Sequence, residues 1–90
     1  MEMQDLNVIS LETQVIKKDG QLIVLIPLSE GGEELKECTE GLSEIEGSCL
    51  KLEIPEWLAG VLRVEEGDRV NISNLNGNFN IWAVNPRLVN

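Results

Sequence analysis

The chain contains no histidine and no tyrosine, and only three of its 90 residues are aromatic, namely Trp57, Phe79 and Trp82. Histidine is the side chain that most often serves as a general acid or base near neutral pH, and it is the commonest metal ligand. Its absence therefore excludes much catalytic and metal chemistry. Because aromatic rings are scarce, the core must be built from leucine, isoleucine and valine.

Cysteine is also scarce, since Cys38 and Cys49 are the only thiols. Their spacing differs from the Cys-x-x-Cys motif of redox proteins, and a structural zinc ion would need two further ligands that only carboxylates could supply. We therefore expect two reduced, buried cysteines and no metal ion or other cofactor. Phosphate-binding glycine loops, serine-nucleophile elbows and calcium-loop spacings are absent as well. These absences predict that the protein is not an enzyme.

Basic residues number seven against 16 acidic ones, which gives a formal net charge of −9 at pH 7. The acidity is regional, because segment 30–66 holds eleven of the acidic residues and only three basic ones. An acidic surface repels phosphates, so we expect nucleic acid binding to be weak or absent, and a protein partner with a basic surface is the natural counterpart. The alternative is that the acidic surface only keeps the protein soluble.

Long hydrophobic runs are absent, the longest being Leu22–Ile26. A membrane helix needs about 20 apolar residues, and the polar start of the chain does not resemble a signal peptide. The sequence therefore predicts a cytoplasmic protein without a membrane partner. Ninety residues are too few to bury two cores, so we expect one domain over 8–85, a flexible N-terminus over 1–7 and a C-terminal tail over 86–90.

Apolar patterning predicts a chain rich in β-strands. One segment is almost continuously apolar and predicts a strand that is covered on both faces, whereas the others alternate and predict half-buried strands. The expected strands cover residues 8–15, 21–28, 50–54, 69–75 and 78–84.

The segments between the expected strands carry turn and helix signals. Asp19-Gly20 and Asn76-Gly77 suit the positive φ angles of tight hairpin turns. Segment 29–47 is acidic and punctuated by glycines, and its apolar spacing predicts a short helix around 33–40 followed by a loop.

Segment 54–70 holds the strongest local signals in the chain. Pro55 lacks an N–H and has a fixed φ, so it fits the first position of a short helix. One face of that helix is then formed by Leu58, Val61 and Leu62. Gly67-Asp68 follows as a structural turn, because glycine accepts positive φ and the aspartate can hydrogen-bond to nearby backbone N–H groups.

This order of an isoleucine-proline strand end, a short Leu-rich helix and a glycine-aspartate turn resembles the swapped-hairpin barrel of AbrB-type and MazE-antitoxin-type proteins, over residues 48–84. The Gly67-Asp68 turn is also similar to the turn shared by the wider group of cradle-loop barrels. The resemblance implies a mostly β, α+β fold, with residues 8–85 forming a single small barrel that carries one or two short helices.

The same resemblance implies DNA binding by a dimer. Its DNA-facing stretch corresponds here to residues 46–53, which carry one lysine against two acids. Lys51 is the residue that matches a phosphate contact, and Arg63 matches less closely. An AbrB-like DNA-binding regulator or antitoxin is therefore the alternative function.

Asparagines surround the predicted hairpin at Asn76-Gly77. Because side chains alternate along a strand, Asn71, Asn78 and Asn80 should share one face with Trp82. Uncharged amides around an exposed tryptophan form a surface of the kind used in recognition. We predict that these four residues bind a partner, the alternative being a polar outer face on which Trp82 packs locally.

These observations predict a small acidic binding or assembly module that engages a protein partner. A homodimer is also expected, because the barrels that the chain resembles exchange hairpins and a two-fold dimer would hide the apolar segment 22–26. The alternative is a barrel closed within one chain, in which Ile26-Pro27 and Ile54-Pro55 mark two equivalent halves.

Overall fold

The structure is a computed structural model that describes residues 8–85. The predicted flexible N-terminus, 1–7, and the predicted tail, 86–90, lie outside the described residues. Two short 3-10 helices, Leu28–Glu30 and Glu37–Thr39, flank the first α-helix. The strands and α-helices are, in chain order, β1 (Val8–Gln14), β2 (Ile16–Lys18), β3 (Gln21–Pro27), α1 (Gly32–Lys36), β4 (Ser43–Glu46), β5 (Cys49–Ile54), α2 (Glu56–Leu62), β6 (Arg69–Leu75) and β7 (Asn78–Ala83).

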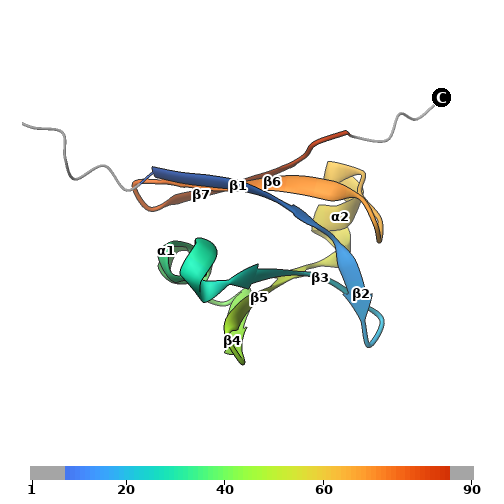
Figure 1. The fold of residues 1–90 in the computed structure, drawn as a ribbon. Coiled ribbons are helices and arrows are strands. Elements are labelled where there is room, and N and C mark those ends of the chain that lie inside the picture. The colour runs from blue at the N-terminus through green and yellow to red at the C-terminus, as the bar shows by residue number, and fades with distance from the viewer. Residues whose placement is uncertain (1–7, 86–90) are drawn as a thin grey trace, which may run out of the picture.

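The strands form two antiparallel sheets that lie one above the other (Figure 1). One sheet has three strands in the order β1-β6-β7, and the other has four in the order β2-β3-β5-β4. Helices α1 and α2 lie at opposite ends of the molecule (Figure 1). The prediction of a mostly β, α+β fold with two short helices is confirmed. Within residues 8–85 the strands stay in two separate sheets and do not close into a barrel.

The chain passes from one sheet to the other at Val15. The sequence predicted a single strand over 8–15, but β1 ends at Gln14 and β2 belongs to the four-stranded sheet. Val15 is fully buried, and its backbone N–H and C=O bond to Asp68 and Gly67. Because Val15 continues the apolar alternation of β1, the sequence pattern gave no sign of this change of sheet.

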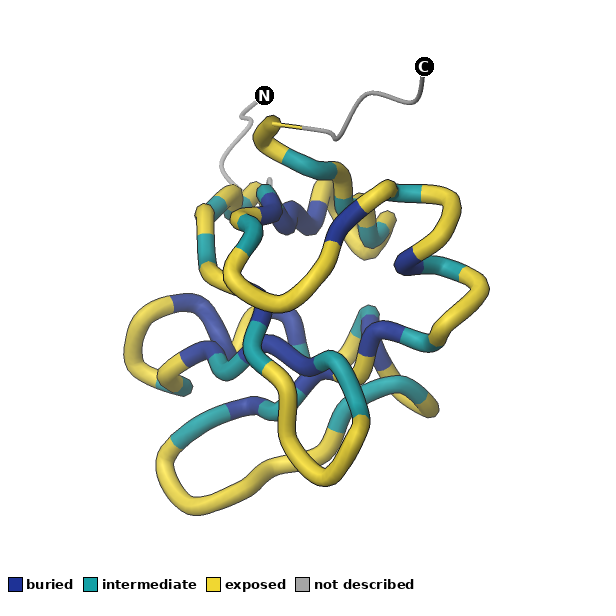
Figure 2. Tube along the Cα trace, turned by 90° about the vertical axis from the view of Figure 1, so that its right-hand side faces the viewer, coloured by how far each residue is buried: buried dark blue, intermediate teal, exposed yellow. Residues whose placement is uncertain are grey.

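The core lies between the two sheets, and the exposed turns lie around it (Figure 2). Val70 and Ile72 face inward from β6 as predicted, and both are fully buried. Burying a side chain of this size contributes about 1.5–3 kcal/mol relative to leaving it exposed. The buried cluster is aliphatic throughout and consists of Val15, Val24, Ile26, Leu35, Leu50, Leu52, Ile54, Ala59, Val64, Val70 and Ile72.

Strand β3 is covered on both faces, as its continuous apolar sequence predicted. Val24 and Ile26 join the core, while Ile23 on the opposite face is only 2% exposed. Lys18 of β2 reaches Glu46 of β4 with an Nζ–Oε2 distance of 3.3 Å, although β3 and β5 lie between these strands. The four-stranded sheet must therefore curl, and Figure 1 shows β2 and β4 bending to the same side. The curl covers Ile23.

Both predicted hairpin turns are present. Asp19 and Gly20 have φ angles of 53° and 78°, and Asn76 and Gly77 have 56° and 95°. Positive φ at both central residues is the signature of the type I′ turn, which matches the right-handed twist of the strands it joins.

The predicted helix around 33–40 is found as α1 followed by its 3-10 turn. Gly32 is required at the start of α1, because a Cβ there would lie 2.9 Å from the backbone oxygen of Ile26. The loop predicted after this helix is wrong in part, since Ser43–Glu46 form β4 and pair with β5. This strand is mostly exposed, so it carries no apolar alternation that the sequence pattern could reveal.

Helix α2 differs from its prediction in two details. Pro55 has ψ of 156° and caps the helix from outside, so the first helical residue is Glu56 and not Pro55. Val61 was expected on the buried face but is 71% exposed, whereas Ala59 is buried. The helix therefore turns its small residue toward the core, while Leu58 and Leu62 are partly buried against it.

Candidate functional site

The solvent face of the three-stranded sheet, which we call the outer face, carries the four residues predicted to bind a partner. Asn71 lies opposite Trp82 in the pairing of β6 with β7, and Ser73 lies opposite Asn80. Asn78 is two residues from Asn80 and points the same way. The structure thus brings these side chains together, and no described element covers them (Figure 1).

The outer face mixes amides and hydroxyls with exposed apolar side chains. Trp82 is 48% exposed, and Val8 and Leu75, which are paired across β1 and β6, are 56% and 45% exposed. The Ser10 hydroxyl donates a hydrogen bond to Asn71 Oδ1 at 3.1 Å, which holds one amide in place. Large apolar groups left in water on a surface with few charges are typical of interaction sites.

The two residues matched to DNA contacts lie on different elements. Lys51 stands in β5, where its ammonium lies 3.0 Å from Glu44 and 4.0 Å from Glu46. The hydrogen bond to Glu44 raises the pKa of Lys51 above its usual value, so the charge is retained but is neutralised by carboxylates. Arg63 caps the C-terminus of α2 in the left-handed conformation, with φ of 61°.

The Gly67-Asp68 turn has the geometry that its sequence suggested. Gly67 has φ of +95°, and the Asp68 carboxylate accepts a hydrogen bond of 2.8 Å from the Glu65 N–H. The turn also binds Val15 through two backbone hydrogen bonds of 2.8 Å. It therefore joins the start of β6 to the residue at which the chain changes sheets.

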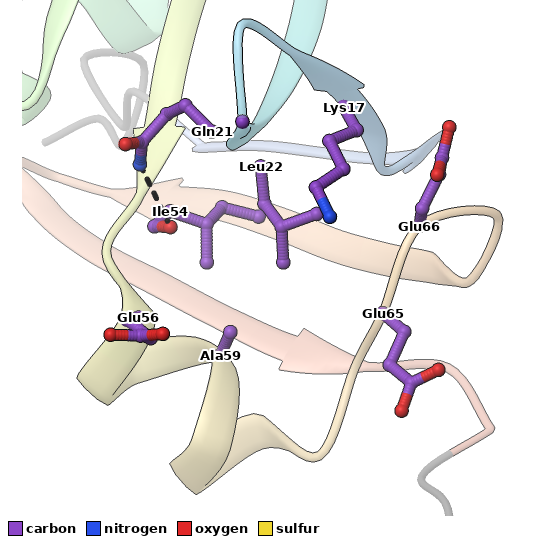
Figure 3. A pocket seen from close by; sticks show the side chains of 9 residues that line it. Lys17, Gln21, Leu22, Ile54, Glu56, Ala59, Glu65 and Glu66 are labelled. Atoms are coloured by element: carbon purple, nitrogen blue, oxygen red, sulfur yellow. Dashed lines mark hydrogen bonds between the residues drawn. The ribbon is translucent and has the colours of Figure 1, made fainter.

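A cleft of about 550 Å³, which we call the α2 cleft, opens between the β2–β3 hairpin and α2 (Figure 3). Leu22, Ile54 and Ala59 supply its apolar lining, and the last two are almost fully buried. Gln21 closes one side by donating a hydrogen bond from Nε2 to the Ile54 carbonyl at 3.3 Å.

The rim of the α2 cleft is charged. Glu56, Glu65 and Glu66 lie on the side of α2 and the loop that follows it, and Lys17 extends toward them from β2 (Figure 3). Sequence reasoning missed this cleft because its lining comes from three segments that are far apart in the chain. The local signal was the pair of acids Glu65-Glu66 that leads into the turn.

A second, shallower hollow of about 480 Å³ lies between α1 and the β6–β7 turn. It contains Cys38 together with Glu33, Glu34 and Glu37. Burial, and then the charge of Glu37, raise the pKa of the Cys38 thiol above its usual value. The thiol is therefore protonated at neutral pH, which is the opposite of what a nucleophilic or metal-binding cysteine needs.

Within residues 8–85, no three histidine, cysteine, aspartate or glutamate side chains are grouped so that they could hold a metal ion. No helix in this range is long and apolar enough to cross a membrane.

Comparisons with protein-family models, with curated proteins and with solved structures found no match.

Proposed function

We propose that the protein is a small, non-enzymatic binding module that engages a protein partner through the outer face. The observation that carries this proposal is the grouping of Asn71, Asn78, Asn80 and Trp82 on a sheet face that no described element covers. A tryptophan gains most from being covered at the centre of an interface, and the surrounding amides can hydrogen-bond to a partner backbone.

The state of the titratable groups favours binding over catalysis. Catalytic acids, bases and nucleophiles need environments that bring their pKa near the working pH. The pKa of the Cys38 thiol is raised, which is away from reactivity, and Lys51 is held in its charged form by Glu44. Neither group is tuned for proton transfer.

The charge distribution of the chain favours a partner whose own contact patch is neutral and whose surrounding surface is basic. The outer face holds one ion pair, between Glu12 and Arg69, and otherwise carries amides, hydroxyls and apolar groups. The net charge of −9 lies mainly in segment 30–66, away from this face. Such a field would speed the approach of a basic protein while the neutral face forms the contact.

The AbrB-like DNA-binding alternative has weaker support. Its best phosphate contact, Lys51, is already paired with Glu44, and phosphate would have to displace a carboxylate in a strongly acidic surrounding. Titration of the protein into mixed-sequence duplex DNA at several salt concentrations tests this alternative. Submicromolar binding that weakens steeply with salt would favour the DNA regulator over the protein-binding module.

Exchange of one exposed tryptophan for alanine tests the proposed outer-face contact, because the chain offers a matched control. Trp82→Ala removes the centre of the outer face, whereas Trp57→Ala removes a tryptophan on α2 that is 69% exposed. A partner is first captured with the wild-type chain, purified, and its affinity measured for each variant. We expect Trp82→Ala to weaken binding at least about tenfold, as hot-spot residues do, and Trp57→Ala to leave it unchanged. Equal affinities of the two variants would contradict the proposal.

A further inference from the structure

We propose that the α2 cleft is a second binding site, separate from the outer face, and that it receives a lysine-containing or arginine-containing extended segment of a partner protein. The volume of about 550 Å³ lies within the range of about 300–1,000 Å³ that is typical of ligand pockets. The cleft is also built from an apolar bottom and a charged rim, and these two features together specify the occupant.

The apolar bottom suits the stem of a long basic side chain. Leu22 is partly exposed and supplies most of this apolar surface, and the almost fully buried Ile54 and Ala59 lie beneath it at the base of the cleft (Figure 3). Lysine and arginine lay their aliphatic stems on such surfaces and keep the charged head in water or beside a counter-charge. A purely apolar segment would cover the same bottom but would leave the acidic rim without a counter-charge.

The acidic rim suits the head of that side chain. Glu56 at the start of α2 and Glu66 in the loop after α2 stand apart along the rim, and neither forms an ion pair within the described part of the chain (Figure 3). Glu65 adds a third carboxylate to the same rim. A guanidinium or ammonium group entering between them would gain charge-assisted hydrogen bonds.

The position of Lys17 leads to a prediction that holds only if the cleft binds a cation. Its side chain extends over Leu22 toward the rim, so the chain already places one lysine stem in the cleft (Figure 3). An incoming cation must lie near this ammonium and is repelled by it. Removing the charge of Lys17 should therefore strengthen binding, whereas removing carboxylates should weaken it.

The test uses full-length, ¹⁵N-labelled protein and a capped seven-residue peptide that contains two lysines separated by one leucine. The same peptide with both lysines acetylated keeps the stems and lacks the charges. We expect the lysine peptide to shift the backbone amide signals of Gly20, Gln21 and Ala59, and the acetylated peptide to shift them much less. Raising the salt concentration should weaken binding of the lysine peptide, because the charges are near the surface.

Two matched double variants test the location of the site. Glu56→Gln with Glu66→Gln removes two rim charges, and Glu30→Gln with Glu40→Gln removes two exposed charges in the segments before and after α1, outside the lining of the cleft. Exposed ion pairs contribute little individually, so the loss of two rim charges should weaken the affinity of the rim variant about twofold to thirtyfold. The control variant should change little, and Lys17→Gln should bind more tightly. If the rim variant does not fold, the affinity of Lys17→Gln still tests the location of the site.

The proposal is overturned if both double variants weaken binding equally, since that would show diffuse attraction to an acidic surface. Cleft signals that shift when the protein alone is concentrated would assign the cleft to a second copy of this chain and would also overturn it. Equal binding of the acetylated peptide would mean that an apolar segment is the occupant. Trp82→Ala should leave peptide binding unchanged, so failure here is distinguishable from failure of the outer-face proposal.

Discussion

The Gly67-Asp68 turn illustrates how one backbone conformation can join distant parts of the chain. Gly67 has φ of +95°, and this places its N–H toward the carbonyl of Val15 at 2.8 Å. The Asp68 carbonyl accepts the Val15 N–H at the same distance, and its carboxylate accepts the Glu65 N–H. The buried residue at which the chain changes sheets therefore has both backbone groups satisfied by this turn.

We predict opposite effects when two glycines are replaced by alanine. A Cβ at Gly67 would meet no atom within 4 Å, so Gly67→Ala should cost only the strain of positive φ, about 1–3 kcal/mol of unfolding free energy. Gly60 lies inside α2 with equally open surroundings and ordinary helical φ, so Gly60→Ala should stabilise the protein by about 0.5–1 kcal/mol. Urea denaturation measures both changes. Equal urea midpoints for Gly67→Ala and the wild type would contradict the structural role of the turn.

We also predict that the Cys38 thiol reacts slowly. Burial and the neighbouring Glu37 raise its pKa, so a smaller fraction is thiolate at pH 8 than in a free cysteine. The thiolate fraction, and with it the rate, should rise with pH up to that raised pKa. Alkylation of the Cys49→Ser variant with iodoacetamide, followed by mass spectrometry, isolates this thiol and compares it with glutathione. Labelling of Cys38 faster than glutathione at pH 8 would contradict the prediction.

Residue-scale predictions from the sequence succeeded where one local rule decides the outcome. The turns at Asp19-Gly20 and Asn76-Gly77 depend on positive φ, and the shared face of Asn80 and Trp82 depends on strand alternation. The buried face of α2 was harder, because a seven-residue helix can rotate so that Ala59 and not Val61 meets the core. That choice depends on how close the neighbouring strands lie, which no local pattern records.

At the scale of whole elements, Asn74 connects the β6–β7 hairpin to α1. Asn74 lies close to this hairpin turn, but the residue is only 6% exposed and its side chain faces away from the outer face. Its Nδ2 donates to the Glu34 carbonyl at 2.9 Å, and its Oδ1 accepts the Gly77 N–H at 2.6 Å. One amide therefore joins a turn to a helix 40 residues away in sequence.

Replacing Asn74 by alanine should loosen this junction. The variant removes two part-buried hydrogen bonds, to the Glu34 carbonyl and from the Gly77 N–H, and a typical hydrogen bond contributes about 0.5–1.5 kcal/mol. We expect a lower free energy of unfolding and faster hydrogen exchange of the Leu35 N–H of α1, which donates to the carbonyl of the N-cap residue Gly31. Asn78→Ala, at an exposed position of the same hairpin, is the control. If both variants match the wild type, Asn74 does not hold α1 in place.

The four-stranded sheet shows which element properties the sequence could not predict. Apolar alternation located β5, and the continuous apolar run located β3. Strand β4 was missed because its pairing with β5 depends on backbone hydrogen bonds and on ion pairs such as Lys51–Glu44, and not on an apolar face. The curl that brings Lys18 to Glu46 is likewise a property of four paired strands together, and no single segment encodes it.

At the scale of the whole molecule, the apolar segment 22–26 no longer argues for a dimer. Its core side packs between the two sheets, and Ile23 on the other side is 2% exposed beneath the curled edge strands. The chain thus covers this segment without a second copy and without closing a barrel. The described residues leave open the outer face and several strand edges, since β7, like β1, β2 and β4, pairs with a neighbouring strand on one side only.

The free edge of β7 makes the homodimer a prediction that can be tested. The Val84 N–H bonds to the Arg69 carbonyl of β6, so alternation directs the N–H groups of Phe79, Ile81 and Ala83 toward the free edge. An exposed edge strand invites pairing, and antiparallel pairing of two β7 strands about a two-fold axis would join two three-stranded sheets into one. We expect light scattering on a sizing column to give twice the 10.0 kDa of one chain.

Hydrogen exchange should show these three N–H groups protected at high protein concentration and exposed on dilution. A mass of one chain at every concentration, with these three groups exchanging rapidly throughout, would show that the single chain is the functional unit and that a partner protein has access to both the edge and the outer face.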